Sequence, residues 1–264
     1  MRKALARYEL RHASKSMRDA ALAFQTRFHI EFDTLTHFSA ETLKEMHALR
    51  LDEPELMKQV FVASENDRTT FESFDVLTRI ANLSAPGLSD RTEYFAALQS
   101  VYRRLEPPLA GDESRLVVAP EREGRIMGEA LGWLRPQDLA PHAKRIPYEH
   151  GLLVGISHCV RVLHAPKIVC IDGAIASGAT LVALLDLLAA PGASVEIYSV
   201  HAAREGLRAI LRFATMADLS VRIHVGHVTE GLCAKFYATE QDGVRLVVGD
   251  LGDMIASVAV AAGK

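Results

Sequence analysis

The chain has 264 residues, of which 49% are hydrophobic and 24% are charged. This size and composition fit a folded protein with one large core, or a core domain with an extension. The net charge of −3 argues against a nucleic-acid-binding surface, which needs an excess of lysine and arginine. No apolar run reaches the length of about 18 residues expected of a membrane span. We therefore expect neither nucleic acid nor a membrane as a partner.

The first 110 residues show a helical pattern. Helical spacing of apolar residues marks three segments, 14–24, 39–49 and 91–102. Ser39 is a residue type that caps the start of a helix, and Pro107 with Pro108 ends the region. We predict a helical N-terminal extension over residues 1–110, which forms a dimer contact or a hood over a substrate pocket, followed by a core domain over residues 111–264.

Short apolar runs alternate with helical segments in the rest of the chain. The candidate strands are residues 115–119, 152–156, 167–171, 194–200, 221–225 and 245–248, and the candidate helices are residues 123–134, 180–189 and 205–216. Continuously apolar strands separated by helices indicate a parallel sheet covered on both faces. We predict an α/β fold with a mostly parallel twisted sheet, whose functional site lies at the carboxyl ends of the strands.

Three cysteines, Cys159, Cys170 and Cys233, show no metal-ligand spacing. Cys170 lies inside an apolar run and is interpreted as a small core residue. This pattern fits a reducing compartment. The N-terminus is basic, but Glu9 and Asp19 interrupt the pattern of a transit peptide. We therefore predict a cytoplasmic protein.

The strongest functional signal is the run Lys167-Ile-Val-Cys-Ile-Asp172-Gly-Ala-Ile-Ala-Ser177-Gly178-Ala-Thr180. Its pattern predicts a buried strand, one carboxylate, a tight loop of small residues and the start of a helix. The unpaired N–H groups at a helix start carry the positive end of the helix dipole, so they bind a phosphate without a lysine. Asp172 is placed to bind hydroxyl groups or a metal beside that phosphate. We favour this interpretation over a simple cap for the loop.

Three further segments belong with this loop. They are Val117-Val-Ala119-Pro120-Glu121-Arg122-Glu123-Gly124, Tyr198-Ser-Val-His-Ala202-Ala203-Arg204-Glu205-Gly206-Leu207, and the stretch from Thr229-Glu230-Gly231-Leu232 to Asp250-Leu-Gly252-Asp253.

In this order the four segments resemble a type I phosphoribosyltransferase, closest to the uracil phosphoribosyltransferase branch. That branch carries Asp-Pro-Met-Leu-Ala-Thr-Gly-Gly-Ser where this chain has Asp172-Gly-Ala-Ile-Ala-Ser-Gly-Ala-Thr180. Its Ala-Ala-Pro-Glu-Gly-Ile matches Ala202-Ala-Arg-Glu-Gly-Leu207, and its Asp-Glu-Gly-Leu precedes a Gly-Leu-Gly-Asp element in the same order. The resemblance covers residues 115–256.

The resemblance implies a donor substrate, phosphoribosyl pyrophosphate, which brings Mg²⁺ as cofactor without a metal site built from protein side chains. Asp172 would bind the ribose hydroxyls and act in catalysis with Arg122 and Arg145. The 5′-phosphate would lie on Ala176, Ser177, Gly178, Ala179 and Thr180. The pyrophosphate would lie on Ala119, Pro120, Glu121 and Arg122. Arg145 resembles the arginine of a mobile loop that closes over pyrophosphate.

The acceptor end departs from the family pattern. The resemblance places the acceptor on Val248, Gly249, Asp250, Gly252 and Asp253, where the proline of the uracil branch is lost and a carboxylate enters. The predicted acceptor is therefore uracil, as in pyrimidine salvage, or a specialised base. Ala179 replaces a family glycine, and its methyl group is tolerated only if φ is negative there.

Other interpretations stay open. Arg122 and Arg125 can form surface ion pairs with neighbouring glutamates, Arg145 can be a surface residue, and Asp250 with Asp253 can be turn residues. The family also suggests a homodimer. The rival function is a non-catalytic protein of the same fold that senses nucleotides or phosphoribosyl pyrophosphate and controls transcription. A dinucleotide-binding domain is disfavoured, because no Gly-x-Gly-x-x-Gly follows a strand.

Overall fold

The structure is a computed structural model. It describes residues 5–48, 50, 52–63, 96, 99–101, 103, 105, 115–121, 123–130, 132–134, 138–157, 165–229, 231–232 and 238–239. Among the helices of these ranges, none combines the length and apolar content that a membrane span requires.

A five-stranded parallel sheet forms the centre of the fold. Its strands stand in the order β3-β9-β8-β7-β4, and all neighbours are parallel. Their bounds are β3 Val60–Val62, β4 Leu116–Val118, β7 Ala165–Ile175, β8 Ala189–Ala203 and β9 Ser220–Thr229. This confirms the predicted α/β class and its parallel sheet.

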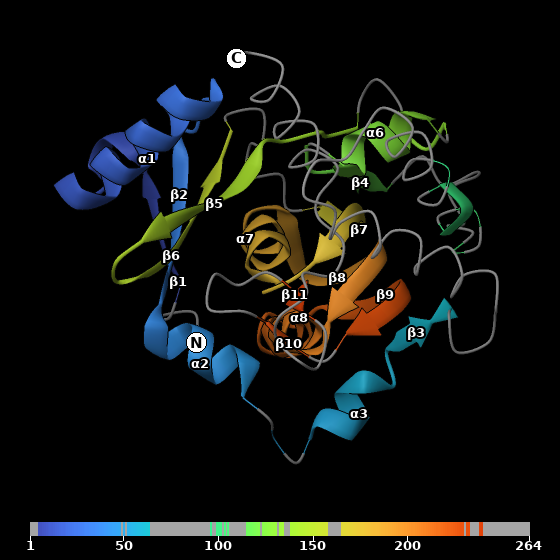
Figure 1. Cartoon of the computed structure of the whole chain (residues 1–264). Coiled ribbons are helices and arrows are strands. Elements are labelled where there is room, and N and C mark those ends of the chain that lie inside the picture. Colours follow the sequence, from blue (N-terminus) through green and yellow to red (C-terminus); the bar gives the residue numbers. More distant parts are fainter. Residues whose placement is uncertain are drawn as a thin grey trace.

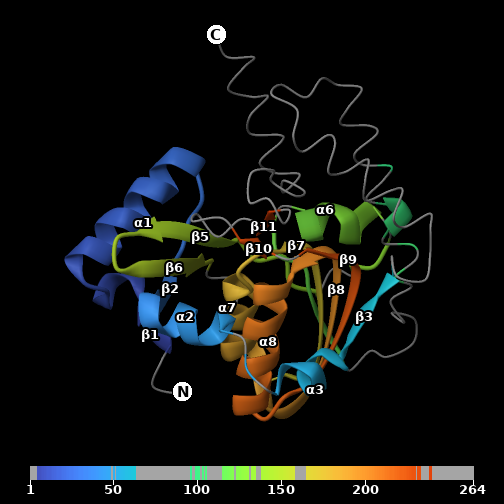
Figure 2. The ribbon, with the colours of Figure 1, turned by 60° about the horizontal axis from the view of Figure 1, so that its bottom comes forward.

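Helices cover this sheet. On one face, α7 (Ala179–Leu188) and α8 (Arg204–Met216) share a buried apolar cluster with β7, β8 and β9 (Figure 2). On the other face, Val101 lies against Gly226 of β9. A Cβ added to Gly226 would be 2.5 Å from Cγ1 of Val101. The helix α6 (Glu123–Ala130) packs against β7. The long apolar strands are therefore buried, as parallel pairing requires.

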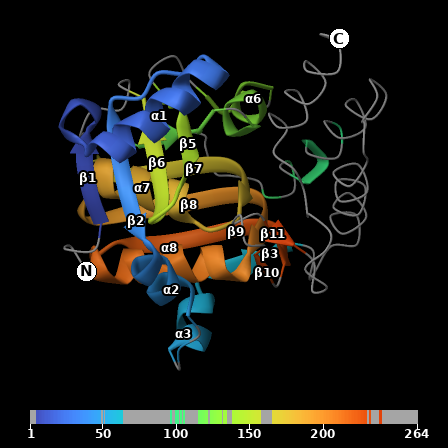
Figure 3. The same cartoon turned by 60° about the vertical axis from the view of Figure 1, so that its left-hand side comes forward.

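A second, antiparallel sheet lies on the far side of α7 (Figure 1). Its order is β1-β2-β6-β5, with β1 Leu5–Glu9, β2 Thr34–Ser39, β5 Ala143–Tyr148 and β6 Gly151–Ile156. One face packs on α7 through Phe38, Val154 and Ile156, and the other packs on α1 (Lys15–Phe28) through Leu35 and Leu153. The helices α2 (Ala40–His47) and α3 (Glu53–Met57) lie against α8 (Figure 3).

The prediction of a helical N-terminal region is not confirmed, because β1, β2 and β3 all lie within it. The sheet content is also not all parallel. Residues 5–9 and 60–62 are too short to show a period, and β2 pairs with β6, more than a hundred residues later. Such pairing depends on distant partners, which local helical spacing does not reveal.

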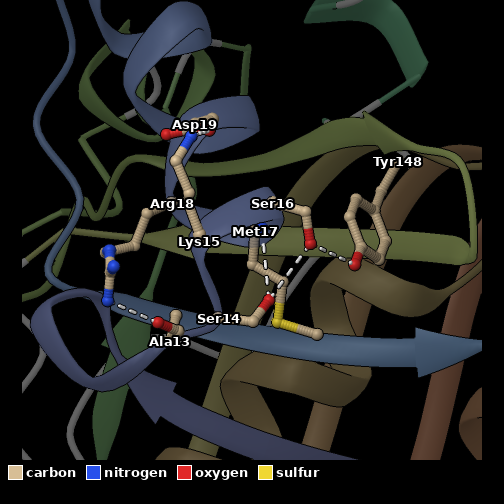
Figure 4. A network of polar contacts seen from close by, with 8 residues as sticks. All are labelled: Ala13, Ser14, Lys15, Ser16, Met17, Arg18, Asp19 and Tyr148. Atoms are coloured by element: carbon tan, nitrogen blue, oxygen red, sulfur yellow. Dashed lines mark hydrogen bonds and ion pairs between the residues drawn. The ribbon is translucent and has the colours of Figure 1, made fainter.

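Side-chain caps start both long helices of the N-terminal region. Ser39 accepts a hydrogen bond from the backbone N–H of Thr42 at 3.1 Å, so the predicted cap is confirmed. At α1, Ser14 accepts from the N–H of Met17 at 3.4 Å (Figure 4). The Ser16 hydroxyl lies 3.0 Å from the Tyr148 hydroxyl, a hydrogen bond that connects α1 to β5 (Figure 4).

Three smaller elements complete the described chain. They are the short 3₁₀ turn η1 (Leu10–His12) and the paired strands β10 (Gly231–Leu232) and β11 (Ala238–Thr239). Cys170 is a buried free cysteine, as predicted, whereas Cys159 and Cys233 lie outside the described residues.

Candidate functional site

The predicted phosphate loop connects β7 to α7 at the carboxyl edge of the parallel sheet. Asp172 is half-buried and pairs with Ser199 of β8; it is not the last residue of its strand, since β7 continues to Ile175. Gly178 has φ +73°, in the left-handed region where glycine has no steric penalty. As N-cap of α7 it provides no side-chain hydrogen bond. The N-cap residue therefore engages none of the N–H groups of the first turn of α7, and the Ser177 hydroxyl accepts only a long hydrogen bond from the N–H of Ala179. Such a helix start suits an anion.

Two glycines bring two more helix starts to this loop. A Cβ on Gly124, in the first turn of α6, would lie 2.2 Å from the carbonyl oxygen of Ile171. A Cβ on Gly206, in the first turn of α8, would lie 2.2 Å from the carbonyl oxygen of Ala176. The helix α8 thus begins against the loop at Ala176, whereas α6 begins against β7 at Ile171, the residue before Asp172. The dipoles of α7 and α8 favour negative charge at the loop. Sequence reasoning missed this packing role, although a glycine early in a predicted helix was the available signal.

The residues predicted to hold the 5′-phosphate lie together in this loop. Ser177 is buried, and its hydroxyl accepts a long hydrogen bond of 3.4 Å from the backbone N–H of Ala179. Ala179 is the first residue of α7 and is absent from the described non-glycine residues with positive φ, as its methyl group requires. Ala176 and Thr180 are half-buried on either side. Their roles as ligands stay predictions.

Backbone hydrogen bonds to residues 139–141 of the same chain hold the predicted pyrophosphate segment in place. The N–H of Ala119 donates to the carbonyl of Leu139 at 2.8 Å, and the N–H of Glu121 donates to that of Pro141 at 2.9 Å. Pro120 has no N–H to offer. The remaining predicted member, Arg122, lies outside the described residues. Any pyrophosphate contact from this segment therefore depends on Arg122 and the start of α6.

The carboxylate of Glu121 is also engaged. It forms an ion pair with Arg125 and lies 2.9 Å from Nδ1 of His142. Hydrogen bonds to Glu129 and Glu121 raise the pKa of Arg125. Arg125 thus forms the glutamate pairs that its alternative interpretation predicted, and these stabilise the first turns of α6.

The structure places Arg145 within the edge strand β5, opposite Val154, and not in a loop between strands. The hairpin turn comes later, at Glu149 and His150. Pro147 made this segment resemble a loop, but proline is compatible with an edge strand. Arg145 is half-buried and shares with Val154 the face of the sheet that packs on α7. The predicted acceptor residues Val248, Gly249, Asp250, Gly252 and Asp253 lie outside the described residues.

The groups buried behind the loop are neutral. Burial, reinforced by the charge of Asp172, raises the pKa of Cys170 to about 12. His201 lies beside Ala174 and His227 in the sheet, and burial followed by the charge of His227 lowers the pKa of His201 to about 3.

No protein-family model matches the sequence, and no curated protein matches it either. The structure is similar to that of the AQ2163 protein from Aquifex aeolicus, with a TM-score of 0.50 and 22% sequence identity over 75% of this chain and 98% of that one. The likeness is one of fold. An adenine phosphoribosyltransferase from Trypanosoma brucei matches with a TM-score of 0.44 and 13% identity, over 64% of this chain and 84% of that one. One from Giardia lamblia matches with a TM-score of 0.38 and 17% identity, over 55% of this chain and 86% of that one.

Within the described ranges, no three or more histidine, cysteine, aspartate or glutamate side chains gather in a way that holds a metal ion. Asp172 is followed by Gly173, so one carboxylate stands at this point of the strand. The site is therefore suited to an anion bound by helix starts, with one carboxylate beside it for hydroxyl groups.

Proposed function

We propose that this protein is a phosphoribosyltransferase, which binds phosphoribosyl pyrophosphate at the carboxyl end of β7 and transfers its 5-phosphoribosyl group to a nitrogen base. The observation that carries the proposal is one continuous segment. Asp172, the left-handed Gly178 and the start of α7, whose N-cap residue has no side chain, follow one another at the carboxyl edge of a parallel sheet. The order of the four sequence motifs supports the same reaction.

Different residues would bind the phosphate and the ribose of the donor. The first turn of α7, with the loop from Ala176, would hold the 5′-phosphate. Asp172 would accept hydrogen bonds from the ribose hydroxyls. In the reaction the bond between C1 and the pyrophosphate oxygen breaks, and the electron pair leaves with pyrophosphate. The lone pair of the base nitrogen forms the new bond to C1, and the nitrogen loses its proton to pyrophosphate or solvent. Catalysis of this kind depends on positioning and on charge around the leaving group more than on a covalent nucleophile.

We propose magnesium as a companion of the donor. Pyrophosphate oxygens are the hard ligands that Mg²⁺ prefers, and the carboxylate of Asp172 is a further oxygen ligand that would suit the ion. When bound, the ion would neutralise charge on the departing pyrophosphate. Arg122 and Arg145 are the proposed protein cations for the same group.

The acceptor is proposed from the resemblance alone. Uracil is the first choice, which would place the enzyme in pyrimidine salvage, and a specialised nitrogen base is the second because residues 248–253 depart from the uracil pattern. The homodimer and the cytoplasmic location stay predictions.

The donor assignment is tested by thermal unfolding. Phosphoribosyl pyrophosphate with Mg²⁺, at about 100 times its Kd, would stabilise the fold by about 2.7 kcal/mol and raise the melting temperature by several degrees. No shift at millimolar concentration would contradict the assignment. Pyrophosphate release with a panel of bases then tests the transfer and identifies the acceptor.

One observation favours the second candidate, a non-catalytic sensor of phosphoribosyl pyrophosphate or nucleotides. The N–H groups of Ala119 and Glu121 are both engaged within the protein, which leaves the pyrophosphate fewer donors. Donor binding without turnover of any base would favour the sensor. Turnover with one base would exclude it.

A further inference from the structure

The phosphate loop is held by a histidine from the N-terminal region. The last residue of α2, His47, lies with its Nε2 at 2.9 Å from the backbone carbonyl oxygen of Ser177. A carbonyl only accepts, so Nε2 carries the hydrogen and donates it. This contact joins residues 130 positions apart in the chain and reaches the peptide bond just before Gly178.

Arginines of α8 hold His47 in place from behind. Arg212, which is 7% exposed, donates from Nη1 to the carbonyls of Glu45 at 3.0 Å and Met46 at 2.9 Å. Arg208 donates to the carbonyl of His47 at 3.4 Å. The last carbonyls of a helix have no partner within it and carry the negative end of its dipole, so these cations fasten the end of α2 to α8 (Figure 3).

A buried carboxylate completes this attachment. Glu53, at the start of α3, forms an ion pair with Arg208, whose Nη2 lies 2.9 Å from Oε1 of Glu53. Nη1 of Arg204 lies 3.9 Å from the same oxygen. Glu53 is 6% exposed, so the pair is shielded from water. The imidazole of His47 is thus presented to the loop by a fixed support.

The surroundings keep the imidazole uncharged at neutral pH. Burial lowers the pKa of His47, and Arg208 and Arg212 lower it further, while its bond to Ser177 and the charge of Glu205 act in the opposite direction. A neutral ring with its hydrogen on Nε2 makes the observed bond.

The orientation of one peptide group depends on this bond. In a planar trans peptide, the carbonyl of Ser177 and the N–H of Gly178 point in opposite directions. Glycine is stable at both positive and negative φ, so the peptide before Gly178 can turn over at little cost. Turned over, it would direct its carbonyl oxygen to the side where its N–H had been, and a carbonyl oxygen repels a phosphate.

We propose that His47 is a positioning residue of the phosphate loop: by holding the Ser177 carbonyl, it directs the N–H of Gly178 toward the bound 5′-phosphate. The inference rests on the proposed function and extends it, because it assigns to the N-terminal region a direct part in donor binding. The inference is compatible with both roles predicted for the N-terminal region, a hood over the acceptor pocket and a dimer contact.

A matched pair of variants tests this role. In His47→Gln the side-chain amide keeps a donor near the position of Nε2, whereas His47→Met has a similar length and no donor. Titration calorimetry with ribose 5-phosphate should show a Kd raised about tenfold for His47→Met, which corresponds to one hydrogen bond of about 1.4 kcal/mol. His47→Gln should recover most of the affinity. With an identified acceptor, His47→Met should raise KM for the donor and leave kcat within about twofold.

Three outcomes separate the inference from the proposed function. Wild-type protein that binds neither ribose 5-phosphate nor phosphoribosyl pyrophosphate would overturn both. Wild-type binding with equal affinity in His47→Met would overturn only the role of His47. If His47→Met changes the free energy of unfolding in urea but leaves the Kd for ribose 5-phosphate unchanged, the role of His47 would also be overturned. His47 would then be a purely structural residue.

A second measurement needs no substitution at all. In ¹⁵N-labelled wild-type protein, the amide proton of Gly178 should move downfield when ribose 5-phosphate is added, because a new hydrogen bond to phosphate forms there. An unmoved Gly178 amide in the saturated complex would overturn the proposed orientation, whatever the fate of the variants.

Discussion

Gly206 of α8 lies directly against the backbone of Ala176 in the phosphate loop. A Cβ at position 206 would be 2.2 Å from the Ala176 carbonyl oxygen and 2.9 Å from Cγ2 of Ile175. Neither neighbour can move freely, since one is backbone and the other is a buried strand residue. The shape of the candidate donor site therefore depends on a helix that follows it by more than twenty residues in the chain.

Gly206→Ala should damage both stability and donor binding. The added methyl group must push α8 away from the loop, which we expect to cost about 1–3 kcal/mol of unfolding free energy. Urea unfolding and the Kd for ribose 5-phosphate measure the two effects. Met216→Ala, at the exposed end of the same helix, is the control. A Gly206→Ala protein with wild-type affinity would show that the loop tolerates the displacement.

Asp172→Asn should lower turnover and leave the fold intact. Asparagine keeps the size of the side chain but loses the charge that strengthens hydrogen bonds from ribose hydroxyls, so kcat/KM should fall about 10- to 100-fold. The matched control is Asp218→Asn, an exposed aspartate with φ +56° in the turn before β9, at the opposite edge of the sheet. Asparagine tolerates that conformation. Near-wild-type activity in Asp172→Asn would show that this carboxylate only caps the loop and does not bind the substrate.

Ala179→Gly should weaken the fold without abolishing donor binding. The substitution introduces the glycine of the family pattern, but Ala179 is a fully buried residue in the first turn of α7. Loss of its methyl group and the greater chain entropy of glycine should together cost about 1–2 kcal/mol. Thermal unfolding with and without ribose 5-phosphate separates the two properties. A variant that loses the ligand-induced shift would mean that the alanine has a binding role of its own.

Stability should fall as the pH is lowered from about 6.5 towards 3, partly because of His201. Burial lowers the pKa of His201 from its ordinary value of 6.5 to about 3, so in this range the unfolded chain binds a proton that the folded protein excludes. Such a group costs at most about 1.4 kcal/mol per pH unit, and no further loss comes from it below pH 3. The pKa values of His47 and His224 are lowered too, so they act in the same direction.

The substitution His201→Gln isolates this contribution. Urea unfolding of wild type and variant at pH 7, 5.5 and 4.5 should give a smaller pH dependence for the variant. Parallel curves for the two proteins would show that His201 takes up its proton without cost.

Several features of the fold follow from local sequence. The largely apolar runs at residues 167–171, 194–200 and 221–225 predict the parallel strands, because such a sheet is covered on both faces. The structure buries most of their side chains and leaves Lys167, Ser194 and Arg222 exposed. The small residues between Asp172 and Thr180 predict the tight loop, and Ser39 predicts a helix start. Each of these signals depends on neighbours within a few positions, so the structure agrees with them closely.

Tertiary structure decided what surrounds the loop. The strand β2 and the edge strand β5, with Pro147 and Arg145, exist because β6 pairs with both, and such pairing has no local period. Gly124 and Gly206 are ordinary glycines in the sequence; their importance appears only when helices pack within reach of Ile171 and Ala176.

The sequence by itself thus determined the α/β class and the strand, loop and helix at Asp172–Thr180, because local composition and spacing carry that information. Only the tertiary structure decided that His47 reaches the Ser177 carbonyl, that α8 begins against Ala176 and that α6 begins against Ile171. These contacts join residues far apart in the chain, and their positions depend on packing between separate elements. Chain-local signals hold no record of such packing.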